Sequence, residues 1–262
     1  MGILYSRRDW FIRPAMLTRQ QIADFARDGY ILVRSLYTAT EMRDITAWTD
    51  EVSNYPEVPG KYMMYFEQSQ IDPARRLLCR IEDFEPYHRN FSSLFNSERM
   101  LGSVTQLFGS TAVLFKDKIN FKMPGGDGFK AHQDMQAGWD VYAPLHITAL
   151  LTIDPCTLAN GCLEVAAGFH KQGLLGDMWK PLPEDELAYK PLPTEPGDAL
   201  FFDSYTPHRS KPNHTDQSRR VLYVTYNRLA DGDQRRRYYD DKRKSYPPDC
   251  ERQPDRKYAF RV

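Results

Sequence analysis

The sequence lacks a long uninterrupted apolar run, and it has no excess of charge of either sign. Because a transmembrane helix needs about 20 consecutive apolar residues, the chain is predicted not to span a membrane. The N-terminus carries Arg7 and Arg8 without the apolar stretch that follows such residues in a signal peptide. Lysine plus arginine and aspartate plus glutamate number 35 each, which argues against nucleic-acid binding. We therefore expect a cytoplasmic protein without a membrane or nucleic-acid partner.

Cysteine motifs, repeats and linkers are also missing. The four cysteines form no CxxC pair and no disulfide framework, which indicates free thiols in a reducing compartment. Residues 1–262 are predicted to form a single domain, with a largely helical N-terminal part (1–110), a jelly-roll core (111–230) and a C-terminal tail (231–262). In the tail, the basic residues 235–237 and 242–244 are interleaved with aspartates, a pattern typical of a solvated charged surface.

Helix signals come first along the chain, and strand signals follow. Thr18 and Gln21 form a capping box for a helix that ends at Gly29, and residues 30–33 predict a strand. Further helices are predicted at 40–52 and 97–108. The pattern then changes to short apolar strands, with Asn160-Gly161 as a hairpin turn between two of them; these strands are 112–122, 147–153, 163–166, 199–202 and 221–226. This order favours a β-sandwich or barrel with peripheral helices.

His132 and Asp134 form a His-x-Asp pair. On an extended strand, residues two apart point to the same side, so both side chains can reach one metal ion. His208 follows the predicted strand 199–202, and facing strands in a barrel would bring its imidazole to the same point. Two histidines and one carboxylate make the facial triad that binds Fe(II) and leaves open positions for substrate and oxygen. We therefore predict His132, Asp134 and His208 as the metal ligands and catalytic centre.

Two arginines, Arg219 and Arg220, begin the apolar strand that follows His208. An arginine is costly to bury without an anionic partner, and its planar guanidinium pairs well with a carboxylate. A dicarboxylate cosubstrate such as 2-oxoglutarate would supply that partner. Because consecutive strand residues point to opposite faces, only one of the two arginines can have this role.

Together these motifs resemble the phytanoyl-CoA dioxygenase superfamily of Fe(II)- and 2-oxoglutarate-dependent oxygenases. The resemblance covers residues 17–230 and rests on Asp28-Gly29-Tyr30, His132-x-Asp134, residues 161–165 and 168–171, Pro196-Gly197-Asp198 and His208. It implies a mainly β fold with peripheral helices, namely a cupin-like double-stranded β-helix (jelly roll). It also implies Fe(II), 2-oxoglutarate and O2 as cofactors. In that family the arginine that binds 2-oxoglutarate lies eleven residues after the second histidine, which selects Arg219.

Four polar residues, Lys116, Lys118, Asn120 and Lys122, share one face of the predicted strand 112–122. The face is either solvated or, in a barrel that holds a ligand, a cationic inner wall. By resemblance to related hydroxylases, Asn120 is expected to bind 2-oxoglutarate, and Lys118 and Lys116 to bind the substrate. Arg261 would be a further substrate contact if the C-terminus folds back, and a disordered tail is the alternative.

Residues 116–134 and Pro247-Pro248-Asp249-Cys250 resemble bacterial organophosphonate hydroxylases. The resemblance implies a small-molecule substrate, 2-aminoethylphosphonate or its N-trimethyl form, hydroxylated at the carbon next to phosphorus with release of succinate and CO2. Asp134 favours hydroxylation because related halogenases lack this carboxylate. The alternatives are a hydroxylase or desaturase of a small secondary metabolite or ectoine-like amino acid, and a non-catalytic jelly-roll protein that binds a metal or ligand. An aromatic cage for a quaternary ammonium and a homodimer both stay open.

Overall fold

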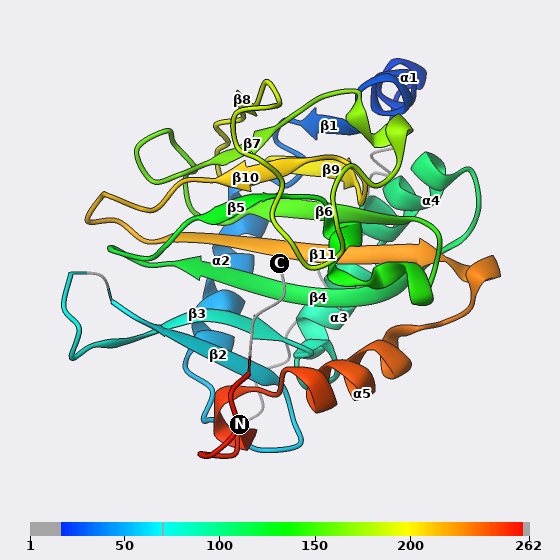
Figure 1. Cartoon of the computed structure of the whole chain (residues 1–262). Helices are drawn as coiled ribbons and strands as arrows, with labels where there is room; N and C mark the ends of the chain where they lie inside the picture. The colour runs from blue at the N-terminus through cyan, green and yellow to red at the C-terminus, as the bar shows by residue number, and fades with distance from the viewer. Residues whose placement is uncertain (1–16, 70, 259–262) are drawn as a thin grey trace, which may run out of the picture.

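The structure, a computed structural model, describes residues 17–69 and 71–258. Two antiparallel sheets face each other at its centre, and side chains from both pack into one apolar cluster (Figure 1). The larger sheet has the order β1-β9-β6-β11-β4-β3-β2, and the smaller has the order β5-β10-β7-β8. The bounds are β1 Tyr30–Val33, β2 Met63–Gln68, β3 Arg76–Glu82, β4 Ala112–Lys122, β5 Phe129–His132, β6 His146–Thr152, β7 Leu163–Val165, β8 Lys190–Pro191, β9 Ala199–Asp203, β10 His208–Ser210 and β11 Arg219–Arg228. The predicted mainly β jelly roll is confirmed.

Helices lie around the larger sheet, and most of them cover its outer face (Figure 1). They are α1 (Arg19–Asp28), α2 (Ala39–Ser53), α3 (Arg89–Phe95), α4 (Ser103–Phe108) and α5 (Arg235–Ser245), with a π-helical turn at Glu98–Gly102. The main hydrophobic core joins these helices to the sheet, for example through Ile45, Phe91, Ile119 and Leu222. None of the described helices has both the length and the apolar character needed to cross a membrane.

The predicted caps at the N-terminal helix are present. The Thr18 side chain accepts from the Gln21 backbone, and the Gln21 side chain accepts from the Thr18 backbone. Gly29 ends the helix with a φ of 81°. A Cβ at this position would lie 2.5 Å from both His170 Nδ1 and Thr206 Oγ1, so a side chain would be strained and would also clash. Gly29 therefore lets the helix turn directly into β1 against the sheet.

Strands β4 and β11 pair along their full length and separate two sides of the molecule. Ile119 and Leu222 face the core under the helices, whereas Tyr223 faces the smaller sheet. Lys118 is the register partner of Tyr223, and the neighbouring Asn120 is 4% exposed. The polar face of β4 thus points into the space between the sheets, and the solvated-face interpretation is wrong.

Three other expectations differ from the structure. The N-terminal part contains α1 to α4, but it also supplies β1, β2 and β3 to the larger sheet, which was not predicted beyond the strand at 30–33. Asn160 and Gly161 lie in a turn, but no hairpin forms because the flanking β6 and β7 belong to different sheets. The tail contains α5, and its Arg235, Lys242 and Arg243 are largely buried rather than solvated.

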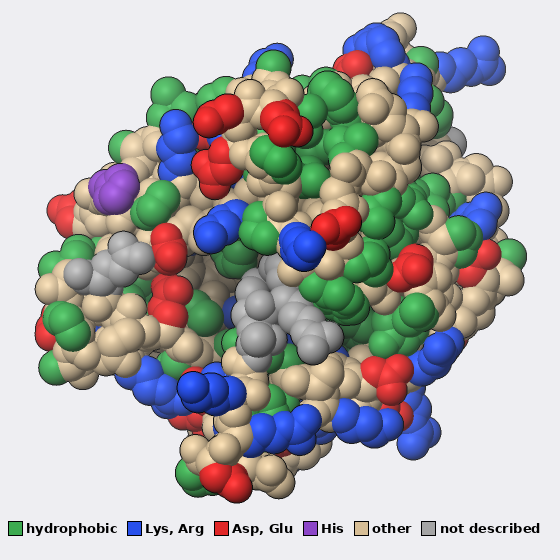
Figure 2. Space-filling model, viewed as in Figure 1, with side chains coloured by type: hydrophobic (Ala, Val, Ile, Leu, Met, Phe, Trp, Pro, Cys, Tyr) green, Lys and Arg blue, Asp and Glu red, His purple; other side chains and the backbone are tan. Residues whose placement is uncertain are grey.

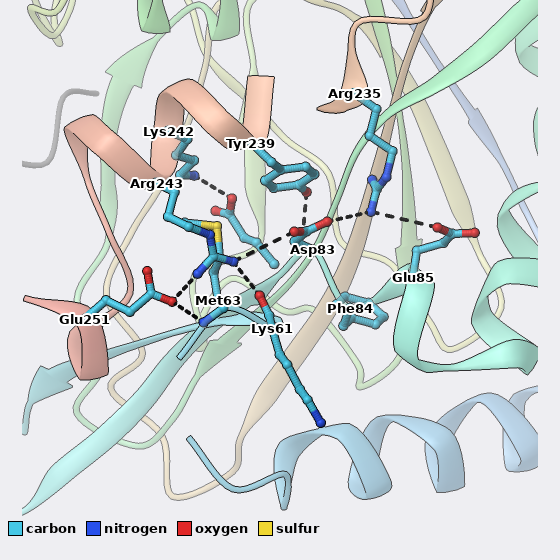
Figure 3. Close-up of polar contacts among 12 residues, drawn as sticks. Lys61, Met63, Asp83, Phe84, Glu85, Arg235, Tyr239, Lys242, Arg243 and Glu251 are labelled. Atoms are coloured by element: carbon cyan, nitrogen blue, oxygen red, sulfur yellow. Dashed lines mark hydrogen bonds and ion pairs between the residues drawn. The ribbon is translucent and has the colours of Figure 1, made fainter. Parts of the chain in front are cut away.

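Helix α5 is anchored by charged side chains of β3, β4 and the turn after β3. Arg235 lies 2.6 Å from Asp117 Oδ1 and 3.0 Å from Asp83 Oδ1, and Lys242 pairs with the fully buried Glu82. Figure 3 shows Arg235 beside Asp83, and Lys242 extending from α5 toward the sheet. By contrast, exposed basic side chains gather along the lower edge of the face in Figure 2, over α5. Acidic partners on the sheet therefore order a segment whose sequence is almost entirely polar.

Candidate metal centre and adjoining cavity

His132, Asp134 and His208 come together at one point, as predicted. His132 ends β5 and His208 begins β10, and the two residues are direct register partners in the smaller sheet. Asp134 begins the 3-10 turn Asp134–Ala137 rather than continuing the strand. Its Oδ1 lies 3.9 Å from Nε2 of each histidine, and one ligand atom from each of the three residues lies within 4.8 Å of the others. Two nitrogens and one carboxylate oxygen suit a non-haem iron site.

Backbone carbonyls orient both imidazoles. Nδ1 of His132 lies 2.7 Å from the Lys130 carbonyl, and Nδ1 of His208 lies 3.0 Å from the Thr206 carbonyl. Each Nδ1–H can donate there, which leaves both Nε2 atoms as lone-pair donors to a metal. Burial and the neighbouring His208 lower the pKa of His132 to about 3, and burial lowers the pKa of His208. Both rings are thus kept neutral, the form that binds metal.

The residue between the first two ligands holds their turn in place. Gln133 is completely buried, and its amide donates to the carbonyls of Gly173 and Tyr205 at 2.8 and 2.6 Å. Its side-chain oxygen accepts from the Leu175 backbone at 2.8 Å. The backbone N–H of Gln133 donates to the Gln136 side chain at 2.9 Å, which closes the turn that carries the aspartate. Sequence reasoning missed Gln133 because no motif marks a residue that acts through backbone contacts.

Arg219 lies at the start of β11 and is 1% exposed, while Arg220 points to the other face. Arg220 pairs with Asp154 and Asp50. Within the described part of the chain, Arg219 has no carboxylate at ion-pair distance, and its Nε has no hydrogen-bond partner. A buried guanidinium without an anion is unfavourable by itself. Arg219 therefore fits the carboxylate of a bound ligand, and Arg220 does not.

Two pockets adjoin the metal centre and share His132 among their lining residues. The Asn120 lobe, of about 460 Å³, is lined by Asn120 and Lys122. The Lys118 lobe, of about 420 Å³, is lined by Lys118, Lys116 and the metal-binding Asp134. The Asn120 side-chain oxygen is buried without a hydrogen-bond partner in the described chain, so this lobe also presents an unsatisfied polar group.

Positive charge dominates the Lys118 lobe. Glu82 is buried beneath it and forms ion pairs with Arg80 at 3.0 Å, with Lys116 at 3.7 Å and with Lys242. Although burial alone would raise it, these three cations hold the pKa of Glu82 well below its ordinary value. Burial lowers the pKa of Lys242 well below its ordinary value, so Arg80 and Lys116 against Glu82 leave one positive charge in excess. Burial and the nearby Lys116 also lower the pKa of Lys118 to about 7, so a bound anion would stabilise its charged form.

Two of the remaining predicted substrate residues lie at the site, and the third cannot be placed. Lys116 and Lys118 both line the lobe beside the metal centre, whereas Arg261 lies outside the described residues. His146 is fully buried and packs against the rings of Phe115 and Trp139. Sequence reasoning missed Arg80 and Lys242 as lining residues. The alternation in Arg76–Glu82 could have indicated a strand with Arg80 and Glu82 on one face, but no local signal placed Lys242 opposite them.

A jelly roll that holds two histidines and one carboxylate at the end of its smaller sheet defines the class of non-haem iron oxygenases. A family model, phytanoyl-CoA dioxygenase (PhyH), matches residues 25–221. The chain belongs to this family, and it is an Fe(II)- and 2-oxoglutarate-dependent dioxygenase.

Individual relatives agree with this assignment. The chain is 40% identical over 247 residues to a 2-aminoethylphosphonate dioxygenase from an uncultured bacterium (HF130_AEPn_1), covering 92% of this chain and 94% of that protein. It is 39% identical over 237 residues to a methylphosphonate hydroxylase from Gimesia maris, covering 88% of each. The crystal structure of EctD from S. alaskensis with 2-oxoglutarate and 5-hydroxyectoine has a similar fold, with a TM-score of 0.71, 20% identity, and coverage of 84% of this chain and 78% of that one.

Proposed function

We propose that the protein hydroxylates a small organophosphonate, 2-aminoethylphosphonate or its N-trimethyl form, at the carbon next to phosphorus. The observation that carries this proposal is the excess of buried positive charge beside the three metal-binding residues. A phosphonate carries up to two negative charges on a compact head, and it needs several cationic donors when it is taken out of water. The names of the two relatives at 39–40% identity point to the same substrate class.

The roles follow from position. His132, Asp134 and His208 hold Fe(II) and are the catalytic residues. Bound Fe(II) with 2-oxoglutarate and O2 supplies the oxidation, in which one O2 converts 2-oxoglutarate to succinate and CO2 and a substrate C–H bond to C–OH. Arg219 fixes the distal carboxylate of 2-oxoglutarate, and we assign Asn120 to the same cosubstrate.

Lys118 and Lys116 bind the phosphonate in the neighbouring lobe. They lie on the same strand as Asn120 and share its face, so one strand positions both cosubstrate and substrate. The reacting carbon is bonded to phosphorus, so the phosphonate must be held close to the metal centre. Lys118 meets this condition because it lines the same lobe as Asp134. Burial raises the pKa of Asp134, but His208 and then Lys118 lower it, so the pKa stays below its ordinary value.

Succinate formation by purified protein with Fe(II), 2-oxoglutarate and ascorbate tests the proposal. We expect formation to depend on 2-aminoethylphosphonate or its trimethyl form, with a hydroxylated phosphonate as the product in ³¹P NMR spectra. His132→Ala should abolish turnover, whereas His170→Ala, at a histidine beside Gly29, should keep it.

The alternatives give different results in the same assay. Turnover of ectoine or another small metabolite, with none of any phosphonate, would assign the enzyme to that second substrate class. Metal binding without consumption of 2-oxoglutarate under any condition would indicate the non-catalytic jelly-roll protein. Lys118→Met adds a specific check, because it should raise the KM for phosphonate while leaving the KM for 2-oxoglutarate within about twofold.

A further inference from the structure

The Lys118 lobe has an acidic side chain at the wall formed by α5. Among the described residues that line this lobe, two are acidic, namely the metal-binding Asp134 and Asp241 of α5. We infer that Asp241, together with Tyr142, binds the primary ammonium group of the substrate and selects an aminoalkylphosphonate over phosphonates without an amine. The inference rests on the proposed function and adds a residue that determines specificity.

Asp241 is held in place by a neighbouring tyrosine of the lobe. The Tyr142 hydroxyl donates to Asp241 Oδ2 at 3.1 Å, and Tyr142 lines the same lobe. The other oxygen, Oδ1, lies 3.7 Å from Lys244 Nζ, whose side chain is 78% exposed. Such a long, solvated ion pair contributes little, so Oδ1 stays available as an acceptor. Asp241 itself is 47% exposed, as expected for the wall of an open pocket.

The lobe offers both kinds of charged group that an aminoalkylphosphonate needs. Its phosphonate and ammonium are separated by two carbons, and the carbon bonded to phosphorus must face the metal centre. Lys118 and Lys116 line the lobe together with Asp134 and would hold the phosphonate beside the metal centre. The ammonium then needs an acceptor other than the metal-binding Asp134, and Asp241 is the other carboxylate among the described residues that line the lobe.

The aromatic lining favours a primary over a quaternary ammonium. A cage for a trimethylammonium group needs aromatic faces that are free to receive it. Here the Lys116 ammonium lies 5.3 Å from the Trp139 ring centre and 5.4 Å from that of Tyr238. The Arg237 guanidinium lies 5.1 Å from the ring centre of Tyr142. These rings already face cations of the protein, whereas a carboxylate with a free acceptor suits N–H donors.

Steady-state kinetics with two phosphonates test this inference, since methylphosphonate has no amine and serves as an internal control. Asp241→Asn should lower kcat/KM for 2-aminoethylphosphonate by about ten- to a hundredfold, the loss expected for one charge-assisted hydrogen bond. The same variant should keep kcat/KM for methylphosphonate within about twofold of the unmodified protein. If methylphosphonate binds without turnover, its inhibition constant should stay within the same range. Tyr142→Phe should have a smaller effect in the same direction.

Asp240→Asn is the matched control. Asp240 precedes Asp241 on α5, is 62% exposed and pairs only at 3.9 Å with the exposed Arg236. The control should behave as the unmodified protein with both compounds. The N-trimethyl analogue cannot donate a hydrogen bond, so it should be the poorer substrate of the unmodified protein and should be affected less by Asp241→Asn.

The outcomes separate the two proposals. Equal losses with both phosphonates, no loss with either, an equal effect of Asp240→Asn, or a preference for the trimethyl form would each overturn the role of Asp241 and leave the proposed function intact. Absence of both turnover and binding with every phosphonate would overturn the proposed function and this inference together.

Discussion

Replacing Arg219 by methionine tests the cosubstrate site most directly. The side chain is 1% exposed and has no carboxylate at ion-pair distance in the described chain. Removing one member of a buried charge pair costs roughly 2–5 kcal/mol, and each 1.4 kcal/mol is about a factor of ten, so the Kd of 2-oxoglutarate should rise by about 30-fold to 4,000-fold. Lys122, the register partner of Arg219, remains nearby and would retain part of the attraction. We therefore expect the lower part of this range, about 30- to 300-fold.

The same substitution should have an opposite effect on the protein without ligand. Replacing a buried charge that lacks a counter-ion by an apolar side chain is neutral or stabilising. Arg220→Met is the matched control, because Arg220 is the next residue but pairs with Asp154 at 2.8 Å. The control should lose roughly 1–3 kcal/mol of unfolding free energy and keep its affinity for 2-oxoglutarate.

Calorimetric titration with 2-oxoglutarate and urea unfolding, both with Mn(II) in place of Fe(II), measure the two quantities. A rise in Kd confined to Arg219→Met, with no loss of stability in the metal-free protein, is the expected pattern. The reasoning would be refuted if Arg219→Met left the Kd within twofold, or if Arg220→Met weakened binding equally. A large loss of stability in Arg219→Met would mean that the guanidinium has an internal role in the fold.

Three further predictions concern stability and metal binding. Burial raises the pKa of Asp203 to about 7, above its unfolded value, so the folded state binds more protons than the unfolded state between about pH 4 and 7. The unfolding free energy should therefore fall as pH rises through this window. Asp203→Asn should remove this difference between urea titrations at pH 5 and pH 8. Arg235→Met should lower the free energy of unfolding by roughly 3–5 kcal/mol in chemical denaturation, because Asp117 is left buried without its cation. Arg236→Met is the control: its side chain is 95% exposed, so stability should change by less than about 0.5 kcal/mol. His208→Ala should lose the visible absorption bands of bound Co(II), and retention of these bands would contradict its role as a ligand.

The sequence was sufficient for the central strands and for the metal-binding residues. The apolar alternation in 112–122 predicted β4 with its observed bounds, and the strand at 30–33 likewise matches β1. His132, Asp134 and His208 could be found because a metal site needs particular side chains, and their resemblance to a family motif supplied the pairing. The reason given for Asp134 was only partly right, since it lies on a tight turn rather than on the strand.

The tail could not be predicted, because its structure depends on residues distant in the sequence. Arg235 and Lys242 belong to a run that is nearly all charged, and a run of this kind is solvated when it has no partners. Their partners, Asp117 and Glu82, lie more than a hundred residues earlier and are 0% exposed. Ion pairs between residues so far apart in the sequence leave no periodic signal, so local sequence patterns could predict neither α5 nor the lobe that it lines.

The position of α5 has a consequence for how substrate preference can change among relatives. The family match ends at residue 221, yet Tyr238 and Lys242 of α5 line the lobe proposed for the substrate. The metal ligands and Arg219 all lie within the matched range. Substitutions on the side of α5 that lines the lobe, for example at Asp241, would therefore change substrate contacts without touching the metal ligands or Arg219. Exchanging α5 between relatives together with its buried partners Asp117 and Glu82 should transfer substrate preference while the iron and 2-oxoglutarate requirements stay the same.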